Sequence, residues 1–146
     1  MATFSLTIAA PARDVFDYLS DPRRRPEWQA SLRAVEPVDH ASIGVGTRWV
    51  DHTVVGARPR LRIVEMRAPD GTGRPGVWGE VGEWRGLRAD LTLRFQDAGP
   101  DRTLLTWSLA LHGSAGWRPL RLVLQALAPG AVRSDLRRAA RILESG

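Results

Sequence analysis

The sequence contains no cysteine, and this absence removes several kinds of chemistry at once. A chain without thiols forms no disulfide, holds no thiolate zinc site or iron–sulfur cluster, and has no cysteine nucleophile. Its three histidines, His40, His52 and His112, form no H-x-x-x-H or H-x-H pair, the spacings that favour a histidine metal site. No glycine-rich phosphate loop or dinucleotide turn is present either, so we expect neither a metal nor another cofactor.

Lysine and asparagine are absent too, so all 21 cationic side chains are arginine, and the net charge is +5. A nucleic-acid-binding chain normally mixes lysine with arginine and gathers them along one stripe, because phosphate requires only positive charge. Here the arginines are spread from Arg13 to Arg141. We interpret the excess as the codon bias of a GC-rich gene and expect no nucleic-acid partner. The run at 23–25 is interpreted as a solvated loop; the alternative is a rim that attracts an anionic ligand or an acidic carrier protein.

Long apolar runs are also missing. No stretch reaches the roughly 18 consecutive apolar residues of a membrane span. Residues 1–10 alternate apolar and polar and lack the basic start of a signal peptide. These observations predict a cytoplasmic protein without a membrane span. The length of 146 residues is close to the commonest domain size, so we expect one domain over residues 1–146.

The apolar pattern predicts a strand, two short helices, six further strands and a long helix, in that order. Phe4, Leu6 and Ile8 alternate with polar residues as in a half-buried strand, and helical segments with prolines near their starts follow at 13–20 and 25–30. Turn residues then separate short segments at about 32–39, 47–55, 60–68, 76–84, 87–97 and 103–112. Since no helix lies between these strands, neighbours are expected to pair antiparallel. Residues 117–144 have helical spacing, with a kink expected at 128–130.

Several motifs in this layout resemble one known family. They are the strand-to-helix segment 8–22, Pro26-Glu27-Trp28, the segment 44–49 with its two glycines and Trp49, and the segment 103–107. These motifs are similar to those of the polyketide cyclase/dehydrase and lipid-transport family of the START-like (SRPBCC) superfamily. The resemblance implies an α+β helix-grip fold, in which a curved seven-stranded antiparallel sheet surrounds the long C-terminal helix and leaves a cavity for a hydrophobic ligand. The chain departs from the family at 68–71, where two consecutive prolines are common, and this affects a loop expected near the cavity mouth.

Hairpin register indicates which polar side chains point into such a cavity, because directly opposed residues of an antiparallel pair share a face. A two-residue turn at 85–86 would oppose Trp84 with Leu87, Glu80 with Leu91 and Trp78 with Leu93, and the last hairpin would oppose Phe95 with Leu105 and Leu93 with Trp107. Glu80 is then a carboxyl among tryptophans. Burial there would raise the pKa of Glu80 and suit it to general acid–base catalysis or to anchoring a ligand hydroxyl or amine. A turn one residue longer would instead place Glu80 in water.

Asp51 and His52 are further acid–base candidates, on one predicted strand. Adjacent strand residues point to opposite faces, so only one of the two points inward. The turn at 56–57 decides which, and the sequence leaves both open: His52 groups with Val50 and Val54, and Asp51 groups with Trp49 and Thr53. A lone histidine on an apolar face is more often a core residue than a catalyst.

Six tryptophans are many for a chain of this length with one tyrosine and three phenylalanines. Large rigid rings suit a pocket for flat or polycyclic apolar ligands, and their N–H groups orient such ligands. The residues expected to line the cavity are Trp28, Trp49, Trp78, Trp84, Leu93, Trp107 and Leu124. For each ring taken singly, the alternative is a place in the packed core.

These features predict binding of a hydrophobic, polyketide-like or aromatic small molecule. As an enzyme, the chain would be a cofactor-free cyclase, aromatase or dehydratase that uses Glu80 with Asp51 or His52 for proton transfer. As a carrier, it would need only apolar walls and few polar anchors. A third hypothesis is a partner-regulating module that docks through the last helix. An acyl carrier protein and a second copy of the chain are the protein partners considered.

Overall fold

The computed structural model describes residues 3–36, 42–113, 116 and 118–146, with the backbone alone for residues 122–127. Its elements are β1 (Thr3–Ile8), α1 (Ala12–Leu19), the short 3-10 helix η1 (Pro22–Arg24), α2 (Arg25–Trp28), β2 (Leu32–Val35), β3 (Arg48–Thr53), β4 (Arg60–Arg67), β5 (Gly76–Trp84), β6 (Leu87–Asp97), β7 (Thr103–Gly113) and α3 (Arg118–Ser145). The predicted order of elements is therefore confirmed. Within these ranges, no helix has both the length and the apolar character needed to cross a membrane.

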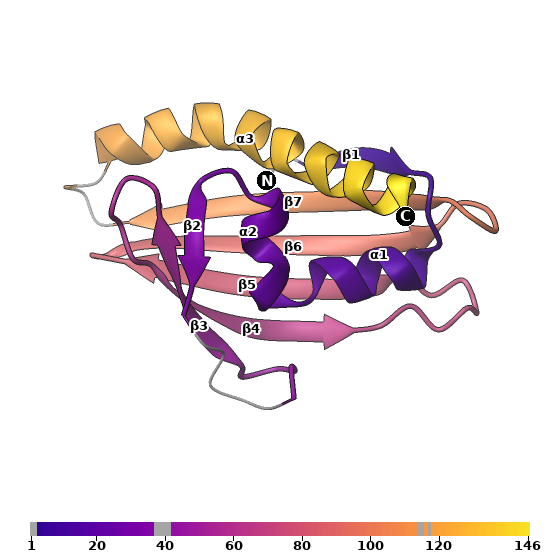
Figure 1. Cartoon of the computed structure of the whole chain (residues 1–146). Helices are drawn as coiled ribbons and strands as arrows, with labels where there is room; N and C mark the ends of the chain where they lie inside the picture. The colour runs from indigo at the N-terminus through magenta and orange to yellow at the C-terminus, as the bar shows by residue number, and fades with distance from the viewer. Residues whose placement is uncertain (1–2, 37–41, 114–115, 117) are drawn as a thin grey trace.

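The strands form one seven-stranded antiparallel sheet in the order β1-β7-β6-β5-β4-β3-β2. Strands β2 to β7 follow one another across the sheet, as expected for strands joined without intervening helices, and β1 pairs with β7 at the other edge. Figure 1 shows α3 running along β7 and β1, with α1 and α2 on the same face of the sheet. This arrangement confirms the predicted α+β helix-grip fold.

The element bounds differ from the prediction mainly where the chain turns. β3 ends at Thr53 instead of residue 55, because the N–H of Gly56 bonds back to the carbonyl of Thr53 and closes the turn. α2 ends at Trp28, since Gln29 already has an extended backbone. β2 ends at Val35; Glu36 is no longer in the strand, and residues 37–39 of the predicted range lie outside the described residues. α3 passes through Pro129 as one helix.

The register of the central hairpins is the one predicted from the turn at residues 85–86. Arg85 and Gly86 both have positive φ, 48° and 84°, as in a two-residue type I′ turn. This turn opposes Trp84 with Leu87, Glu80 with Leu91 and Trp78 with Leu93, and the next hairpin opposes Phe95 with Leu105 and Leu93 with Trp107. Glu80 therefore points to the face that the helices cover.

The inward face of the sheet is filled at one end and hollow at the other. A row across the strands contains Trp78, Leu93 and Trp107, all about 1% exposed, and the neighbouring pair Phe95 and Leu105 is fully buried. Towards the β5–β6 turn, the next two inward rows contain no large rings. One row consists of Glu80, Leu91 and Leu109, and the next consists of Leu61, Gly82, Ala89 and Leu111. Small side chains at residues 82 and 89 leave space there that large rings fill elsewhere.

Helix packing closes the filled end of the sheet. Phe16 of α1 meets Phe95 edge to face, with 5.2 Å between ring centroids, and Leu136, Ala139 and Ala140 of α3 belong to the same buried cluster. Short α2 is attached to α1, because the Tyr18 hydroxyl donates a 3.0 Å hydrogen bond to Glu27 Oε1. This contact fixes the position of α2 over the middle of the sheet.

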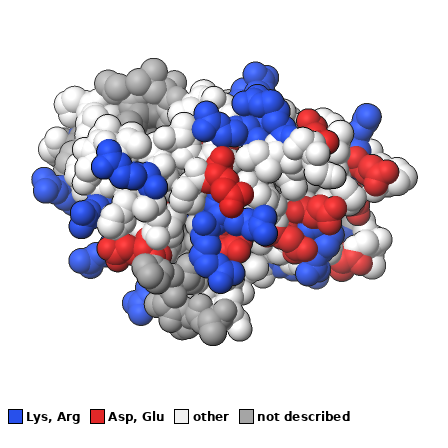
Figure 2. All heavy atoms as spheres, viewed as in Figure 1, with Lys and Arg blue, Asp and Glu red and all other residues white. Residues whose placement is uncertain are grey.

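Charged side chains of both signs are interleaved on the helix-bearing face, as Figure 2 shows. Arg13 pairs with Asp17 at 3.1 Å within α1, and Arg23 pairs with Asp21 at 3.0 Å before α2. Such exposed pairs contribute little to stability, roughly 0–1 kcal/mol each. The interleaving agrees with the interpretation that most arginines are solvated surface residues.

The Tyr18–Glu27 contact predicts an unusual titration for the chain's one tyrosine. Burial, with a further contribution from the hydrogen bond and charge of Glu27, raises the pKa of Tyr18 to about 12. Absorbance near 295 nm should therefore show tyrosinate forming about two pH units above the ordinary value of roughly 10. Because the folded-state pKa is the higher one, the stability linked to this proton is present below pH 10 and is lost as the pH rises towards 12. A midpoint near 10 in the folded protein would contradict this prediction, and Glu27→Gln should lower the midpoint.

Candidate functional site

A cavity of about 460 Å³ occupies the hollow end of the sheet. Its walls are mostly aliphatic, and among the described residues they include Val54, Val55, Leu61, Gly82, Trp84, Leu87, Ala89, Leu91, Leu109, Leu111 and Val132. Four charged residues line the cavity as well. Glu83 is exposed, whereas Arg25, Asp51 and Glu80 are almost fully buried, at 4%, 3% and 5% exposure. Apolar walls with a few converging polar groups are typical of a small-molecule site.

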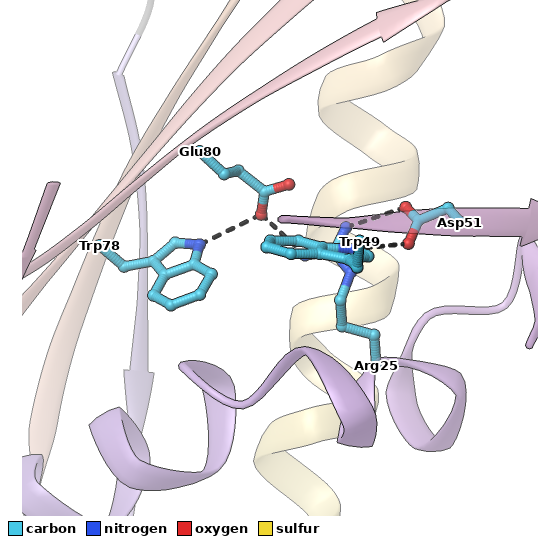
Figure 3. A network of polar contacts seen from close by, with 5 residues as sticks. All are labelled: Arg25, Trp49, Asp51, Trp78 and Glu80. Atoms are coloured by element: carbon cyan, nitrogen blue, oxygen red, sulfur yellow. Dashed lines mark hydrogen bonds and ion pairs between the residues drawn. The ribbon is translucent and has the colours of Figure 1, made fainter. Parts of the chain in front are cut away.

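Arg25 enters this site from α2 and connects the helix layer to the sheet. Its Nη1 donates a 2.7 Å hydrogen bond to Glu80 Oε1 on β5, and its Nη2 donates a longer one, 3.4 Å, to Asp51 Oδ2 on β3 (Figure 3). The guanidinium carbon also lies 5.9 Å from the ring centroid of Trp28 and 5.4 Å from that of Trp49. The tryptophan faces shield the charge from water and contribute cation–π attraction.

The two carboxylates are held by indole donors as well as by Arg25. Trp49 Nε1 donates to Asp51 Oδ1 at 2.9 Å, and Trp78 Nε1 donates to Glu80 Oε1 at 3.1 Å. In each case donor and acceptor are two residues apart on one strand, so they point to the same side of the sheet. Two of the six tryptophans thus fix the orientation of the acidic groups instead of stacking on a ligand.

One carboxylate oxygen of the cluster is without a partner in the described part of the chain. Glu80 Oε1 accepts both of that residue's hydrogen bonds, while Glu80 Oε2 accepts none. Asp51, by contrast, uses both oxygens, one with Trp49 and the other with Arg25. Among the described residues that line the cavity and are almost fully buried, Glu80 Oε2 is therefore the carboxylate oxygen with free lone pairs.

The electrostatics of the cluster favour a proton or a positively polarised group. Burial raises the pKa of Asp51; the charge of Arg25 opposes this rise and that of Glu80 adds to it. Burial alone would lower the pKa of Arg25, but Glu80 and Asp51 hold it above its ordinary value, so the guanidinium stays charged. Asp135 of α3, whose pKa burial also raises, interacts with the same guanidinium. The cluster thus has more carboxyl groups than cations.

The structure places the two adjacent acid–base candidates of β3 on opposite faces, and only Asp51 enters the site. His52 points away, and its Nε2 lies 2.9 Å from Glu36 Oε1 at the surface. The reason is the turn after β3, in which Thr53 N–H bonds to the carbonyl of Ala57. His52 therefore cannot act on a molecule in the cavity, and the acid–base set reduces to Glu80 and Asp51.

The expectation of an aromatic-lined cavity needs correction. Among its tryptophans, Trp84 lines the cavity, whereas Trp28, Trp49, Trp78 and Trp107 are buried in the packed core, as is Leu93. The physical reason is the size of the side chains in neighbouring cross-strand rows. Large rings in the row through Trp78 fill the space on one side of Glu80, and the small residues Gly82 and Ala89 leave space on the other side. Leu124 was also expected to line the cavity, but its side chain lies outside the described residues.

Sequence reasoning missed Arg25, since it belongs to a run of three arginines that is typical of a solvated loop. Arg23 is exposed as expected, but Arg25 is almost fully buried. The available signal was indirect. The sequence offers two carboxyl groups for the inward face, Glu80 and Asp51, with His52 as the alternative to Asp51, and buried carboxylates require a cation. No group of histidines or acidic residues in the described ranges is arranged to hold a metal ion.

Removing Arg25 should destabilise the fold strongly, because Asp51 and Glu80 would remain buried without a cation. We expect Arg25→Met to lower the free energy of unfolding by about 3–5 kcal/mol. The triple variant Arg25→Met, Asp51→Asn, Glu80→Gln should recover most of that loss, since no charge is left unpaired. Urea unfolding followed by circular dichroism measures both. Arg23→Met is the matched control and should change stability by less than about 1 kcal/mol. A triple variant as unstable as the single one would contradict this account.

Solved structures with the same fold include several proteins of low sequence identity. The di-domain ARO/CYC StfQ from the steffimycin biosynthetic pathway is 17% identical with a TM-score of 0.73; the match covers 99% of this chain and 45% of that one, so this chain spans less than half of that protein. A START superfamily protein from Mycobacterium smegmatis is 14% identical (TM-score 0.71; 99% and 97% covered), and the Zhui aromatase/cyclase from a Streptomyces species is 18% identical (TM-score 0.70; 98% and 92% covered). At these identities the likeness shows the fold alone.

Among curated proteins, none matches the sequence significantly. The family described as polyketide cyclase / dehydrase and lipid transport matches residues 1–145. This match covers the whole sheet, the helices and every residue of the buried cluster. The chain therefore belongs to the polyketide cyclase/dehydrase and lipid-transport family.

Proposed function

We propose that the chain binds an apolar, polyketide-like carbonyl compound in the cavity and catalyses a proton transfer on it, as cyclisation, aromatisation and dehydration require. The observation that carries this proposal is the free Oε2 of Glu80, on a buried carboxylate beside a buried guanidinium in an apolar cavity. Neither a metal nor a nucleotide is needed for such a step, because a positioned base and a charged hydrogen-bond donor suffice.

The cavity walls determine how a ligand would lie. Leu91, Leu109 and Leu111 offer a flat apolar surface to fused rings, and burying those rings supplies most of the binding energy. A polar atom of the ligand is poorly accommodated against these walls but is well placed near Arg25, Asp51 and Glu80. The ligand is thereby oriented with its carbonyl end towards the charged cluster.

Proton transfer follows from the roles of two residues. Glu80 Oε2 removes a proton from the carbon next to the ligand carbonyl, and the bonding electrons move onto the carbonyl oxygen as an enolate. The positive charge of Arg25 lies beside Glu80 and stabilises the negative charge that develops. Glu80 then returns its proton to the oxygen or to a carbon, so the group ends the cycle as a carboxylate.

A carrier without catalysis is the second candidate, favoured by one observation. Apart from Glu80 Oε2, every carboxylate oxygen of Asp51 and Glu80 is bonded within the protein, as in an ion pair whose purpose is structural. The carrier hypothesis predicts binding of the same compounds without any proton exchange. A measurement that follows binding and exchange separately therefore distinguishes the two functions.

The test uses 2-tetralone, a fused-ring ketone with exchangeable protons beside its carbonyl. Proton NMR in deuterated buffer should show faster exchange with the wild-type protein than with buffer alone. Glu80→Gln should reduce that acceleration by about 100-fold or more, in line with the loss of a general base. Its affinity for 2-tetralone should stay within about threefold, because the amide keeps the size of the carboxylate and can still accept from Arg25.

Glu65→Gln, on the exposed part of β4, is the matched control and should exchange like the wild type. Binding of 2-tetralone without any acceleration by the wild-type protein would refute catalysis and support the carrier. Equal exchange rates for wild type and Glu80→Gln would refute the role of Glu80.

Gly82 offers a test of the cavity that leaves the charged cluster untouched. A Cβ at this position would have only ordinary contacts, 3.5 and 3.6 Å from Leu61 atoms, so a side chain fits and extends towards the cavity. Gly82→Leu should keep the fold and weaken 2-tetralone binding at least about tenfold by filling the space that the rings need. Gly130→Leu, at an open position on α3, should bind like the wild type. Calorimetric titration measures both, and unchanged affinity in Gly82→Leu would place the ligand elsewhere.

A further inference from the structure

A second hollow lies next to the cavity, at the ends of β4, β5 and β6. This groove, here called the arginine groove, has a volume of about 470 Å³ and is lined by Arg58, Arg60, Glu83, Trp84, Arg85, Gly86, Leu87 and Arg88. Glu83, Trp84 and Leu87 line the cavity as well, so the two hollows share a wall at the tip of the β5–β6 hairpin. Arg60, Glu83 and Arg88 form a cross-strand row on the face of the sheet that points away from the cavity, so the groove lies on the outer side of this tip. The exposed Val55 on the cavity lining shows that the cavity opens at this end of the molecule.

The charge of the arginine groove is unbalanced. Four arginines line it, against one acidic side chain, Glu83. Arg88 is paired with Asp90 at 2.8 Å, but Arg58 and Arg60 are exposed and form no ion pair with any residue that the structure describes. Figure 2 shows arginine side chains along the left edge of the molecule, the end where these turns lie. Positive charge is therefore in excess on the outer side of the hairpin tip whose inner side lines the apolar cavity.

Arg85 stands where turn geometry alone would favour another residue. Its φ of 48° makes it the one non-glycine residue with positive φ in the described chain, and the next residue, Gly86, has φ 84°. The first position of such a type I′ turn favours asparagine, aspartate or glycine, because a Cβ atom is strained at positive φ and only glycine lacks it, while short polar side chains offset the strain by local hydrogen bonds. The guanidinium lies 5.3 Å from the ring centroid of Trp84, which belongs to the shared wall. A charged group is thus held at the boundary between groove and cavity.

We propose that the arginine groove binds the anionic group, a phosphate or carboxylate, of an amphiphile whose apolar part occupies the cavity. Guanidinium groups suit this task, since their donors match the geometry of phosphate and carboxylate oxygens. The proposal depends on the proposed function only for the place of the apolar part. It adds a second recognition element, so the molecule recognised is an acyl or aryl chain with an anionic end outside the cavity.

The experiment compares two probes that differ in their end group, decan-1-ol and decyl phosphate. Calorimetric titration should show decyl phosphate binding at least about tenfold more tightly at low salt, the size of effect that one or two charge-assisted hydrogen bonds produce. This advantage should shrink in about 200 mM sodium chloride, because exposed charges are screened. The double variant Arg58→Gln, Arg60→Gln should lose most of the advantage and keep its affinity for decan-1-ol. Arg102→Gln, in the turn between β6 and β7, removes one exposed arginine outside the groove and should behave as the wild type.

Arg85→Asn distinguishes a role of Arg85 in binding from a role in stability. We expect the variant to change the melting temperature and the affinity for decyl phosphate in opposite directions. Asparagine suits the positive φ, so the melting temperature should rise or stay the same, while the affinity for decyl phosphate falls. A residue with a purely structural role would not lose affinity as stability rises.

The results distinguish this proposal from the proposed function. Equal affinities for the two probes, or an unchanged advantage in the arginine variants, would overturn the arginine groove and leave the cavity intact. Tight decyl phosphate binding with no decan-1-ol binding would support the groove and contradict occupation of the cavity. Sedimentation with phosphatidylcholine vesicles, with and without phosphatidic acid, identifies the source of the phosphate. Arginine-dependent binding to the acidic vesicles assigns it to a lipid headgroup, and decyl phosphate binding alone assigns it to a free amphiphile.

Discussion

The buried charge of Arg25 is the constraint on which the rest of the site depends. A guanidinium in a protein interior is costly unless carboxylates surround it, so α2, β3 and β5 must meet where Asp51 and Glu80 reach it. The Tyr18–Glu27 contact fixes α2 on one side, and the β3–β4–β5 register fixes the two acids on the other. One ion cluster thereby joins the helix layer to the sheet at its centre.

The same cluster marks the boundary between core and cavity. On one side of Glu80, the row through Trp78 and Trp107 fills the space beneath the helices. On the other side, Gly82 and Ala89 stand opposite one another and leave it open. The position of this boundary follows from the size of the inward side chains, since the strand order and register are the same on both sides of it. Ligand choice in this chain therefore resides in wall residues and not in the fold.

Local rules were sufficient for the fold and for part of the site. The two-residue turn at Arg85–Gly86 sets the register, so the inward direction of Glu80 follows from one of the two turn lengths that the sequence allows at this hairpin. The orientation of Asp51 was not, since it depends on a turn whose length the sequence leaves ambiguous. The burial of Arg25 was not predictable for a different reason. It results from contacts with Asp51 and Glu80, which lie 26 and 55 positions further along the sequence, and no neighbouring residue distinguishes Arg25 from Arg23. Local sequence patterns do not predict which charged residues pair across long distances in the chain.

The hollow end has a mechanical consequence. Strands β5, β6 and β7 are each anchored in the packed core near Trp78, Phe95 and Leu105 and then extend past the last buried row towards the cavity. The ends of β5 and β6 carry the shared wall of cavity and arginine groove, and the end of β7 lines the cavity alone. Fewer packed side chains hold these ends than hold the rows at Trp78 and Phe95, so a displacement of the ends would disturb less of the core packing than a displacement of those rows. Backbone amide hydrogens near these ends should accordingly exchange with solvent faster than those of Trp78, Phe95 and Leu105.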